Sequence, residues 1–370
     1  MKFLFGLIAV ILSVAAPTAL HGAGGSTVRK TRNVILITTD GLRWQEVFGG
    51  AEAGLMNRKR GRVENTNALW KTFWRDQPEA RREALMPFFW SMIGKQGQIF
   101  GNQSRGSVVK VSNRLNFSYP GYNEILTGVP DPRIDSNAKK PNPNVNVLAW
   151  LDQKADYTGR VAAFCAWDVF PYILNRERNG LPVRAGWEPM AVGEANPRRE
   201  LLNELVAETT PMWENVIYDS LMFRGAFDYF HEAKPRFFYV AFGETDDWAH
   251  EGRYDRYLHA ARRVDRYLAL LWEAVQSLPD YRDKTTLIIT TDHGRGGGPK
   301  KWKDHGKSVK GSEYIWLAAL GPDTAALGER GNTPLITQSQ VAATVAAFLG
   351  EDYCAAFPHA GKPVDELITP

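Results

Sequence analysis

The sequence has few cysteines, no marked excess of charge of either sign, and a single long apolar run. Two cysteines in 370 residues, Cys165 and Cys354, with no CxxC pair, exclude a disulfide framework and a thiolate metal site. The balance of 45 Lys and Arg against 41 Asp and Glu, a net charge of +4, is not that of a nucleic-acid-binding module. The 44% hydrophobic content excludes a disordered chain and provides for a large core.

The long apolar run lies at the N-terminus, where Met1 and Lys2 precede FLFGLIAVILSVAA at residues 3–16. A positive charge, a short apolar run and small residues after it are typical of a secretory signal peptide, here over residues 1–23, whose cleavage site stays open. An uncleaved membrane anchor is the alternative, although the run is shorter than the roughly 20 residues of a span. We therefore expect an exported mature protein, periplasmic or secreted, with no stable membrane span after cleavage.

Short apolar runs rich in β-branched residues alternate with longer segments of helical periodicity. The expected strands are Val34–Thr38, Val108–Val111, Arg160–Cys165, Phe237–Phe242, Leu287–Thr291 and Ile315–Leu320. The expected helices span about 145–154, 199–224, 253–277 and 338–349. The strands are continuously apolar, as in strands that are covered on both faces. The alternation predicts an α/β fold with a largely parallel central sheet and helices on both faces.

Polar side chains follow three of the expected strands at the point where each strand ends. With one histidine of the Gly- and Lys-rich loop 294–312, they form a set of carboxylates and imidazoles: Asp40, Asp246, His250, Asp292, His293 and His305. Functional groups of parallel α/β sheets gather beyond the carboxyl ends of the strands. One aspartate at a strand end is usually a cap or a turn residue. Three such ends that also carry histidines predict a metal site.

The residue types indicate which metals this site takes. Mixed Asp and His ligands favour zinc, with manganese or iron as alternatives. Calcium and magnesium are bound by oxygen ligands, and such a site would not need three histidines. Three aspartates and three histidines suffice for two metals with open positions. The Asp246-x-x-x-His250 spacing brings both side chains to one side of a helix or turn. Gly294 eases the turn that Asp292 and His293 need in order to converge.

The order of the motifs between Asn33 and His305, namely DG, S-x-P, D-x-x-x-H, DHG and HG, resembles the alkaline phosphatase superfamily. The likeness is closest to its nucleotide pyrophosphatase/phosphodiesterase and sulfatase-like branches. It implies an alkaline-phosphatase-like three-layer sandwich, a single hydrolase domain over residues 28–370, and two Zn²⁺ ions. The two implied ligand sets are Asp40, Asp292 and His293 for one ion, and Asp246, His250 and His305 for the other. Asp247 does not align with a ligand of the superfamily motif, and its expected role is that of a supporting residue or a helix cap.

The segment NFSYPGYNEILTG at 116–128 resembles the superfamily's nucleophile segment, with Ser118 in the nucleophile's place. At the start of a helix, backbone N–H groups and the helix dipole favour a phosphate. A serine hydroxyl is a poor nucleophile at neutral pH, so Ser118 is also expected to be a metal ligand. The alternative is that Ser118 only caps the helix. Asn137 is a candidate for the superfamily's transition-state asparagine, and a turn residue is the equal alternative.

Two departures from the superfamily pattern bear on the substrate. Tyr122 stands where the sulfatase motif has arginine, which argues against a formylglycine residue and a true sulfatase. Gly121 and Tyr122 replace the Asn-His of the diesterase branch, so a preference for diesters does not follow. Trp167 and Asp168 follow another strand end, and they either line the substrate pocket or pack in the core.

The sequence thus predicts an exported two-metal hydrolase of phosphoric esters, a phosphatase or a phosphodiesterase, that acts through a phosphoserine on Ser118. Its expected partner is a small-molecule phosphate ester, and its oligomeric state stays open. One alternative is a phosphotransferase, mutase or sulfatase-like hydrolase of the same superfamily. Such transferases usually carry several membrane spans and such mutases are usually cytoplasmic, which this sequence does not match. A non-catalytic metal-binding protein is a further alternative, although the nucleophile and six ligands are intact.

Overall fold

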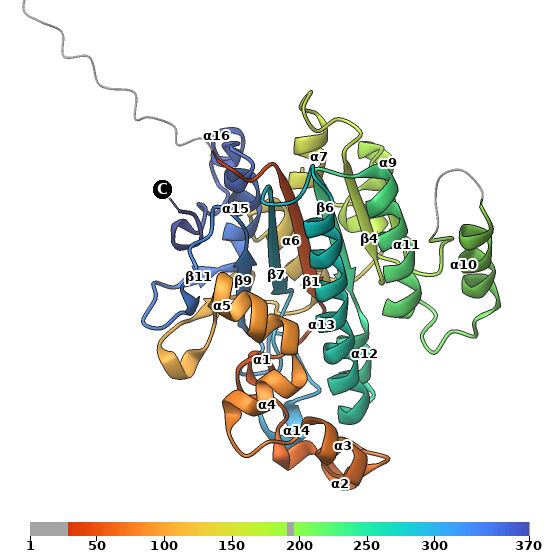
Figure 1. Ribbon diagram of the computed structural model, residues 1–370, viewed down its shortest axis with the longest axis vertical. Helices are drawn as coiled ribbons and strands as arrows, with labels where there is room; N and C mark the ends of the chain where they lie inside the picture. The colour runs from red at the N-terminus through yellow and green to blue at the C-terminus, as the bar shows by residue number, and fades with distance from the viewer. Residues whose placement is uncertain (1–28, 191–195, 370) are drawn as a thin grey trace, which may run out of the picture.

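The computed structural model describes residues 29–190 and 196–369, which are built around an eight-stranded sheet (Figure 1). The strand order is β10-β2-β9-β7-β1-β6-β4-β5. The strands are β1 Asn33–Thr39, β2 Gln98–Phe100, β4 Val161–Cys165, β5 Val183–Ala185, β6 Phe237–Phe242, β7 Thr285–Thr291, β9 Leu317–Leu320 and β10 Gly328–Glu329. From β7 to β5 all neighbours are parallel, whereas β9 runs antiparallel to both β7 and β2. The predicted largely parallel α/β sheet is confirmed.

Two expected strands lie outside this sheet in whole or in part. A second sheet of three strands joins β3 Val109–Lys110, β8 Tyr314–Ile315 and β11 Ile336–Thr337. The expected strand over 108–111 therefore does not belong to the central sheet. The expected strand over 315–320 is divided, because the chain passes from one sheet to the other at Trp316. The indole of Trp316 is fully buried, and its Nε1 donates a hydrogen bond of 2.9 Å to the carbonyl of Leu42.

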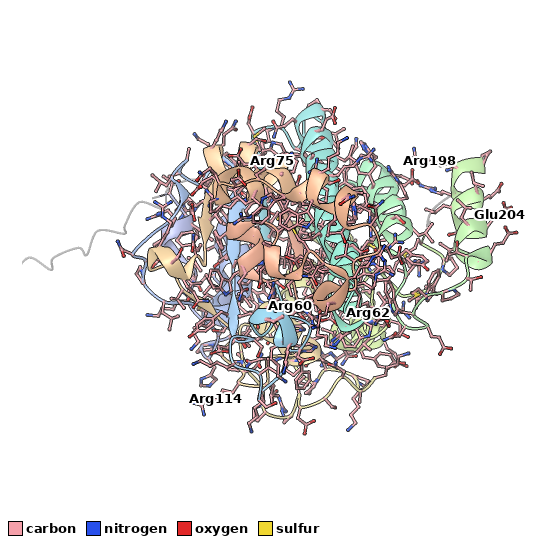
Figure 2. All side chains as sticks on the ribbon, turned by 90° about the horizontal axis from the view of Figure 1, so that it is seen from below. Arg60, Arg62, Arg75, Arg114, Arg198 and Glu204 are labelled. Carbon is pink, nitrogen blue, oxygen red and sulfur yellow. The ribbon has the colours of Figure 1, made fainter. Side chains whose placement is uncertain are left out.

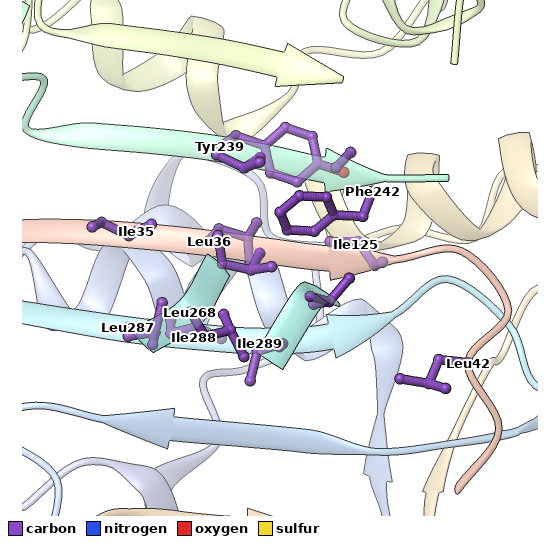
Figure 3. Close-up of a cluster of buried hydrophobic side chains, with 14 of the residues drawn as sticks. Ile35, Leu36, Leu42, Ile125, Tyr239, Phe242, Leu268, Leu287, Ile288 and Ile289 are labelled. Carbon is purple, nitrogen blue, oxygen red and sulfur yellow. The ribbon is translucent and has the colours of Figure 1, made fainter. Parts of the chain in front are cut away.

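Both faces of the central strands are buried, as their continuous apolar runs predict. β1 lies between β6 and β7, with Leu36 opposite Tyr239 on one side and Ile288 on the other, and every residue of the three strands is buried. Figure 3 shows these side chains packed with Leu268 of the long helix α13, which spans Tyr254–Ser277. Burial of each large apolar side chain contributes roughly 1.5–3 kcal/mol. This core holds the strand ends in place, and the functional loops leave from those ends.

Helices cover both faces of the sheet, so the three-layer arrangement is confirmed (Figure 1). One layer contains α11 Asp219–Ala233, α12 Glu244–His250 and α13 Tyr254–Ser277; the other contains α6 Ser118–Thr127, α7 Val147–Asp152 and α15 Val341–Phe348. Shorter elements lie in the connections: α1 Trp44–Gly49, η1 Ala53–Leu55, α2 Arg58–Gly61, α3 Thr66–Phe73, α4 Pro78–Leu85, η2 Phe89–Ile93, α5 Gly94–Gln96, η3 Gln103–Arg105, α8 Phe170–Ile173, α9 Arg176–Asn179, α14 Gly298–Lys301, η4 Gln338–Gln340, α16 Tyr353–Ala356 and η5 Asp365–Leu367.

The prediction of one helix over 199–224 is wrong, because the structure has two helices there. α10 spans Pro197–Glu208 and is followed by a break before α11 begins. The break contains Pro211, which disfavours helical backbone at the preceding residue and has no N–H to donate. α10 packs against α11, where Arg199 pairs with Asp228, and it carries Arg198 and Glu204 on its surface (Figure 2).

Within residues 29–190 and 196–369, no helix has the length and apolarity that a membrane crossing requires. The predicted signal peptide over 1–23 lies outside the described residues, and export stays a prediction. Both cysteines are free thiols: Cys165 is buried in β4, and Cys354 is half-buried. The two therefore do not pair.

Candidate functional site

The carboxyl ends of three neighbouring strands carry predicted ligands. Asp40 directly follows β1, Asp292 directly follows β7, and Asp246 lies in the first turn of α12, which begins just after β6. β1 pairs in parallel with both β6 and β7, and the three strands end level with one another. The three carboxylates therefore meet at one edge of the sheet, where parallel α/β sheets place their functional groups.

Asp40, Asp292 and His293 form a first group, and all three side chains are buried. Nε2 of His293 lies 3.3 Å from Oδ1 of Asp40 and 3.5 Å from Oδ2 of Asp292. Among the described residues, none of these three atoms has a hydrogen-bond partner. A buried polar atom without a partner costs about 1–3 kcal/mol, and folded proteins rarely tolerate one. Three such atoms facing one another fit the ligands of a cation.

Asp246, His250 and His305 form a second, more accessible group. Nε2 of His250 lies 3.1 Å from Oδ2 of Asp246 and 2.9 Å from Nε2 of His305. Nε2 of His305 lies 3.7 Å from Oδ1 of Asp246. The side chain of His250 is 48% exposed, whereas that of His293 in the first group is not exposed at all. The second group can therefore be reached from solution.

The two groups adjoin each other. Nε2 of His293 in the first group lies 3.7 Å from Oδ1 of Asp246 in the second. The rings of His293 and His305 stack with centroids 3.9 Å apart and planes inclined by 12°. Within each group the ligand atoms all lie within 4.8 Å of one another. Two such groups side by side match the ligand arrangement of two-metal sites, which clamp the attacking and leaving oxygens of a displacement.

Hydrogen bonds to the backbone orient two of the imidazoles. Nδ1 of His293 lies 2.9 Å from the carbonyl oxygen of Gly294, and Nδ1 of His305 lies 3.2 Å from that of Asn116. A ring that donates from Nδ1 presents Nε2 as a lone-pair donor, which is how metal-ligating histidines are commonly held. Both Nε2 atoms therefore point into their groups, where each offers a lone pair to a cation once it carries no proton.

Burial and neighbouring charge shift the pKa values of the first group. Burial and the charge of Asp40 raise the pKa of Asp292. Burial lowers the pKa of His293, but the carboxylates of Asp292 and Asp40 outweigh it and raise that pKa to about 9. In the second group, burial and the charge of His293 lower the pKa of His305. Without metal the first group therefore holds protons on its buried side chains, and a divalent cation would take the place of those protons.

Arg295 is a residue that the sequence analysis missed, and it is fully buried beside the second group. Its guanidinium forms an ion pair with Asp246 and donates hydrogen bonds to the carbonyls of Gly41 and Lys303, at 3.1 Å and 2.6 Å. Burial lowers the pKa of Arg295 to about 9. The side chain joins the loop after β1, the helix α12 and the Gly-rich loop. Its place two residues after His293 is the only signal for it in the sequence.

Ser118 is the first residue of α6, and its side chain is buried. The N-cap position is Phe117, and no side chain caps this helix end. The alternative that Ser118 only caps the helix is therefore wrong. The first backbone N–H groups of an α-helix have no partner within the helix, so this end can receive an anion.

Two residues that depart from the superfamily's nucleophile segment join α6 to the first group. The hydroxyl of Tyr122 donates a hydrogen bond of 3.0 Å to Oδ2 of Asp40, which leaves Oδ1 free toward His293. A Cβ atom on Gly121 would lie 2.4 Å from the carbonyl oxygen of Asp292. Only glycine therefore lets α6 approach the end of β7 so closely.

Asn137 lies at the same end of α6, where it contacts the backbone of Tyr119. Its Oδ1 accepts a hydrogen bond of 3.0 Å from the backbone N–H of Tyr119. Its Nδ2 makes no hydrogen bond within the described parts of the chain, and the residue is exposed. Asn137 is thus held by one of the free N–H groups of the helix and keeps two donor hydrogens beside Ser118.

Asp247 belongs to neither group of ligands in the described chain. The cap of α12 comes instead from Asp219, whose Oδ1 accepts a hydrogen bond of 2.9 Å from the N–H of Gly243. In return, Oε1 of Glu244 accepts one of 2.9 Å from the N–H of Asp219. This exchange fixes the start of α12 against the start of α11, and with it the ligands on α12. A helix-cap role for Asp247 is therefore wrong.

Comparisons with known proteins agree with this arrangement. Residues 213–350 match the family model described as Metalloenzyme superfamily. That segment contains five of the six predicted ligands: Asp246, His250, Asp292, His293 and His305. In the search of curated proteins, no sequence matches the chain.

Solved structures share the fold. The alkaline phosphatase PafA has a TM-score of 0.60 at 11% identity, over 92% of this chain and 100% of that chain. The phosphonate monoester hydrolase of Silicibacter pomeroyi has 0.55 at 13% identity, over 92% and 77%. A 2-O GAG sulfatase has 0.51 at 12% identity, over 91% and 72%. The matched segment and the shared fold confirm the resemblance to the alkaline phosphatase superfamily that the motifs predict.

Proposed function

We propose that the chain is a metal-dependent hydrolase of phosphoric esters that acts through a phosphoserine on Ser118. One observation carries this proposal: the two groups of Asp and His ligands adjoin each other at the sheet edge where α6 begins with Ser118. The first group contains unpaired buried atoms. Tyr122 and Gly121 hold α6 against that group. The donor types suit Zn²⁺, with Mn²⁺ or Fe as alternatives. Asp40, Asp292 and His293 would hold one ion, and Asp246, His250 and His305 the other.

Bound divalent cations would supply Lewis acidity, which polarises the phosphoryl oxygens and lowers the pKa of a hydroxyl or water in the site. The residues of the chain do the rest. Ser118 Oγ loses its proton and attacks phosphorus, forming the Oγ–P bond while the bond from phosphorus to the leaving oxygen breaks. The N–H of Ser118 at the start of α6 and the Nδ2 hydrogens of Asn137 bind the phosphoryl oxygens, because Asn137 already takes the N–H of Tyr119 and Pro120 has none. Water then adds its hydroxyl to phosphorus while the Oγ–P bond breaks, the remaining proton of the water returns to Ser118 Oγ, and the phosphate product leaves.

The substrate class is tested by hydrolysis of three substrates: p-nitrophenyl phosphate, which is a monoester; bis(p-nitrophenyl) phosphate, which is a diester; and p-nitrophenyl sulfate. We expect phosphate esters to be cleaved at least about a hundredfold faster than the sulfate, because the serine is not a formylglycine. Chelation should abolish this activity, and added Zn²⁺, Mn²⁺ or Fe²⁺ should restore it. A faster sulfate reaction, or phosphate turnover that is indifferent to chelators, would contradict the proposal. The ratio of monoester to diester rates decides between a phosphatase and a phosphodiesterase.

Arg295→Met should weaken metal binding at the second group by about 10- to 100-fold, as loss of an outer hydrogen-bonding partner typically does. The physical reason is that Asp246 loses the buried cation that holds its carboxylate in place. Equilibrium dialysis at limiting Zn²⁺ should show about two bound ions per wild-type chain and about one per variant chain. Arg75→Met, which changes an exposed arginine (Figure 2), is the matched control. Equal affinity of both sites in the Arg295 variant would refute this role.

A further inference from the structure

A cavity of about 640 Å³ lies beyond the carboxyl ends of β4 and β5. Its wall includes Lys139, Asp168 and Trp187. β4 pairs in parallel with β6, which leads into α12, so the cavity opens at the same edge of the sheet as the two ligand groups. Its volume falls in the range of about 300–1,000 Å³ that is usual for small-molecule pockets. Asp168 thus lines a pocket, one of the two alternatives that its position after a strand predicts.

The segment 137–141 joins this cavity to the start of α6. Asn137 accepts a hydrogen bond from the N–H of Tyr119, the residue after Ser118. The hydroxyl of Tyr119 donates one of 2.7 Å to the carbonyl of Lys140. Lys139 and the proline that follows Lys140 line the cavity itself. A phosphoryl group at Ser118 would therefore have this cavity beside it, across the segment 137–141.

The cavity has an excess of negative charge. Its two cations are already paired: Nζ of Lys139 lies 2.6 Å from Oδ2 of Asp168, and Arg176 lies 2.8 Å from Glu188. Two further lining carboxylates, Glu177 and Glu214, form no ion pair or side-chain hydrogen bond with any described residue. Oδ1 of Asp168 is also without a partner. The lining therefore has a net charge of −2 among the described residues and free acceptor atoms.

An aromatic side chain in the wall is held rigidly. Nε1 of Trp187 donates a hydrogen bond of 2.9 Å to the carbonyl of Trp213, and its ring meets that of Tyr218 edge-on at 5.6 Å. Trp187 is half-buried, so part of the indole remains available to a ligand. Carboxylates together with an indole attract an organic ammonium group through ion pairing and cation–π contact, and they repel a second anionic group.

We propose that this cavity binds the leaving group of the ester and that it selects an alcohol bearing an ammonium group. The inference rests on the proposed function, because it names the substrate class of that site. Phosphate binds at Ser118 and the ligand groups, while the amino end of the alcohol lies among Glu177, Glu214 and Asp168. Esters whose alcohol carries a carboxylate or another phosphate are disfavoured, since that charge would meet the unpaired carboxylates.

The test compares kcat/KM for three phosphate monoesters whose alcohols differ in charge: O-phosphoethanolamine, glycerol 3-phosphate and 3-phosphoglycerate. The ammonium ester should exceed the neutral one by at least about tenfold, the equivalent of one good charged contact, and the carboxylate ester should be the poorest. The preference should fall with added salt. An equal or reversed order would overturn the inference.

Variants assign the preference to the cavity. The double variant Glu177→Gln/Glu214→Gln should lower the ratio of kcat/KM for the ammonium and neutral esters by about fivefold or more, because it removes two unpaired charges. Glu208→Gln, an exposed position at the end of α10 that does not line the cavity, is the matched control and should leave the ratio unchanged. An unchanged ratio in the double variant would refute the cavity's role. If the wild type hydrolyses neither p-nitrophenyl phosphate nor bis(p-nitrophenyl) phosphate, the proposed function is refuted instead, and the inference with it.

Discussion

Replacing Ser118 by alanine should lower phosphate-ester turnover by about three orders of magnitude or more, while both metal sites keep their ions. In the proposed mechanism Ser118 supplies the attacking oxygen, and the alanine side chain has no oxygen. The fold should be nearly unaffected, because the serine side chain caps no helix end and alanine is a good helix former. Turnover of p-nitrophenyl phosphate, metal content and the thermal midpoint would be measured on the same preparation.

Ser220→Ala provides the matched control, since it removes an exposed hydroxyl from the first turn of α11. That variant should keep wild-type turnover. Acid quenching during turnover followed by peptide mass spectrometry should find a phosphoryl group on the peptide that contains Ser118. Wild-type turnover in Ser118→Ala, or a phosphoryl group on another residue, would show that the covalent step is wrong.

Asp292→Asn should have opposite effects on the metal-free and the metal-loaded protein. Without metal, the first group crowds two buried carboxyl groups, burial and the charge of Asp40 raise the pKa of Asp292, and Oδ2 of Asp292 has no partner. Asparagine removes a carboxyl group that is costly to ionise there and keeps an acceptor for the N–H of Gly41, 3.0 Å away. The metal-free variant should therefore be about 1–3 kcal/mol more stable than the metal-free wild type.

With metal the order should reverse. An ion at a thousandfold excess over its Kd stabilises the wild type by about 4 kcal/mol, and a variant with a disabled first group loses most of that gain. Denaturant unfolding with and without Zn²⁺ measures both effects, and activity should fall to the level of chelated wild type. Asp280→Asn, which changes an exposed carboxylate, should alter neither quantity. A variant that is less stable than the wild type without metal would contradict the electrostatic argument.

The sequence alone predicts the elements whose signals are local. The apolar runs at β1, β6 and β7 are correct within two residues, because strands buried on both faces need unbroken apolar sequence. The six Asp and His side chains that the motifs single out are the same six that the structure gathers into two groups. Parallel neighbouring strands must end at one edge, so residues just after them converge whatever the rest of the fold does.

Contacts between distant segments could not be predicted in this way. The burial of Arg295 against Asp246, and the hydrogen bond from Tyr122 to Asp40, join residues 49 and 82 positions apart. The division of the expected strand 315–320 between two sheets could not be predicted either, because it follows from the burial of Trp316. The cavity beside α6 arises only when segment 137–141 meets the loops after β4 and β5.

The sequence by itself therefore determined the class of fold and the six candidate ligands, since residue type and periodicity act over a few neighbouring positions. The tertiary structure alone decided which atoms of those side chains stay unpaired, where Arg295 is buried, and which charges line the cavity beside α6. Those properties depend on distances across the sheet and on exclusion of water, and both arise only when the strands and helices pack together.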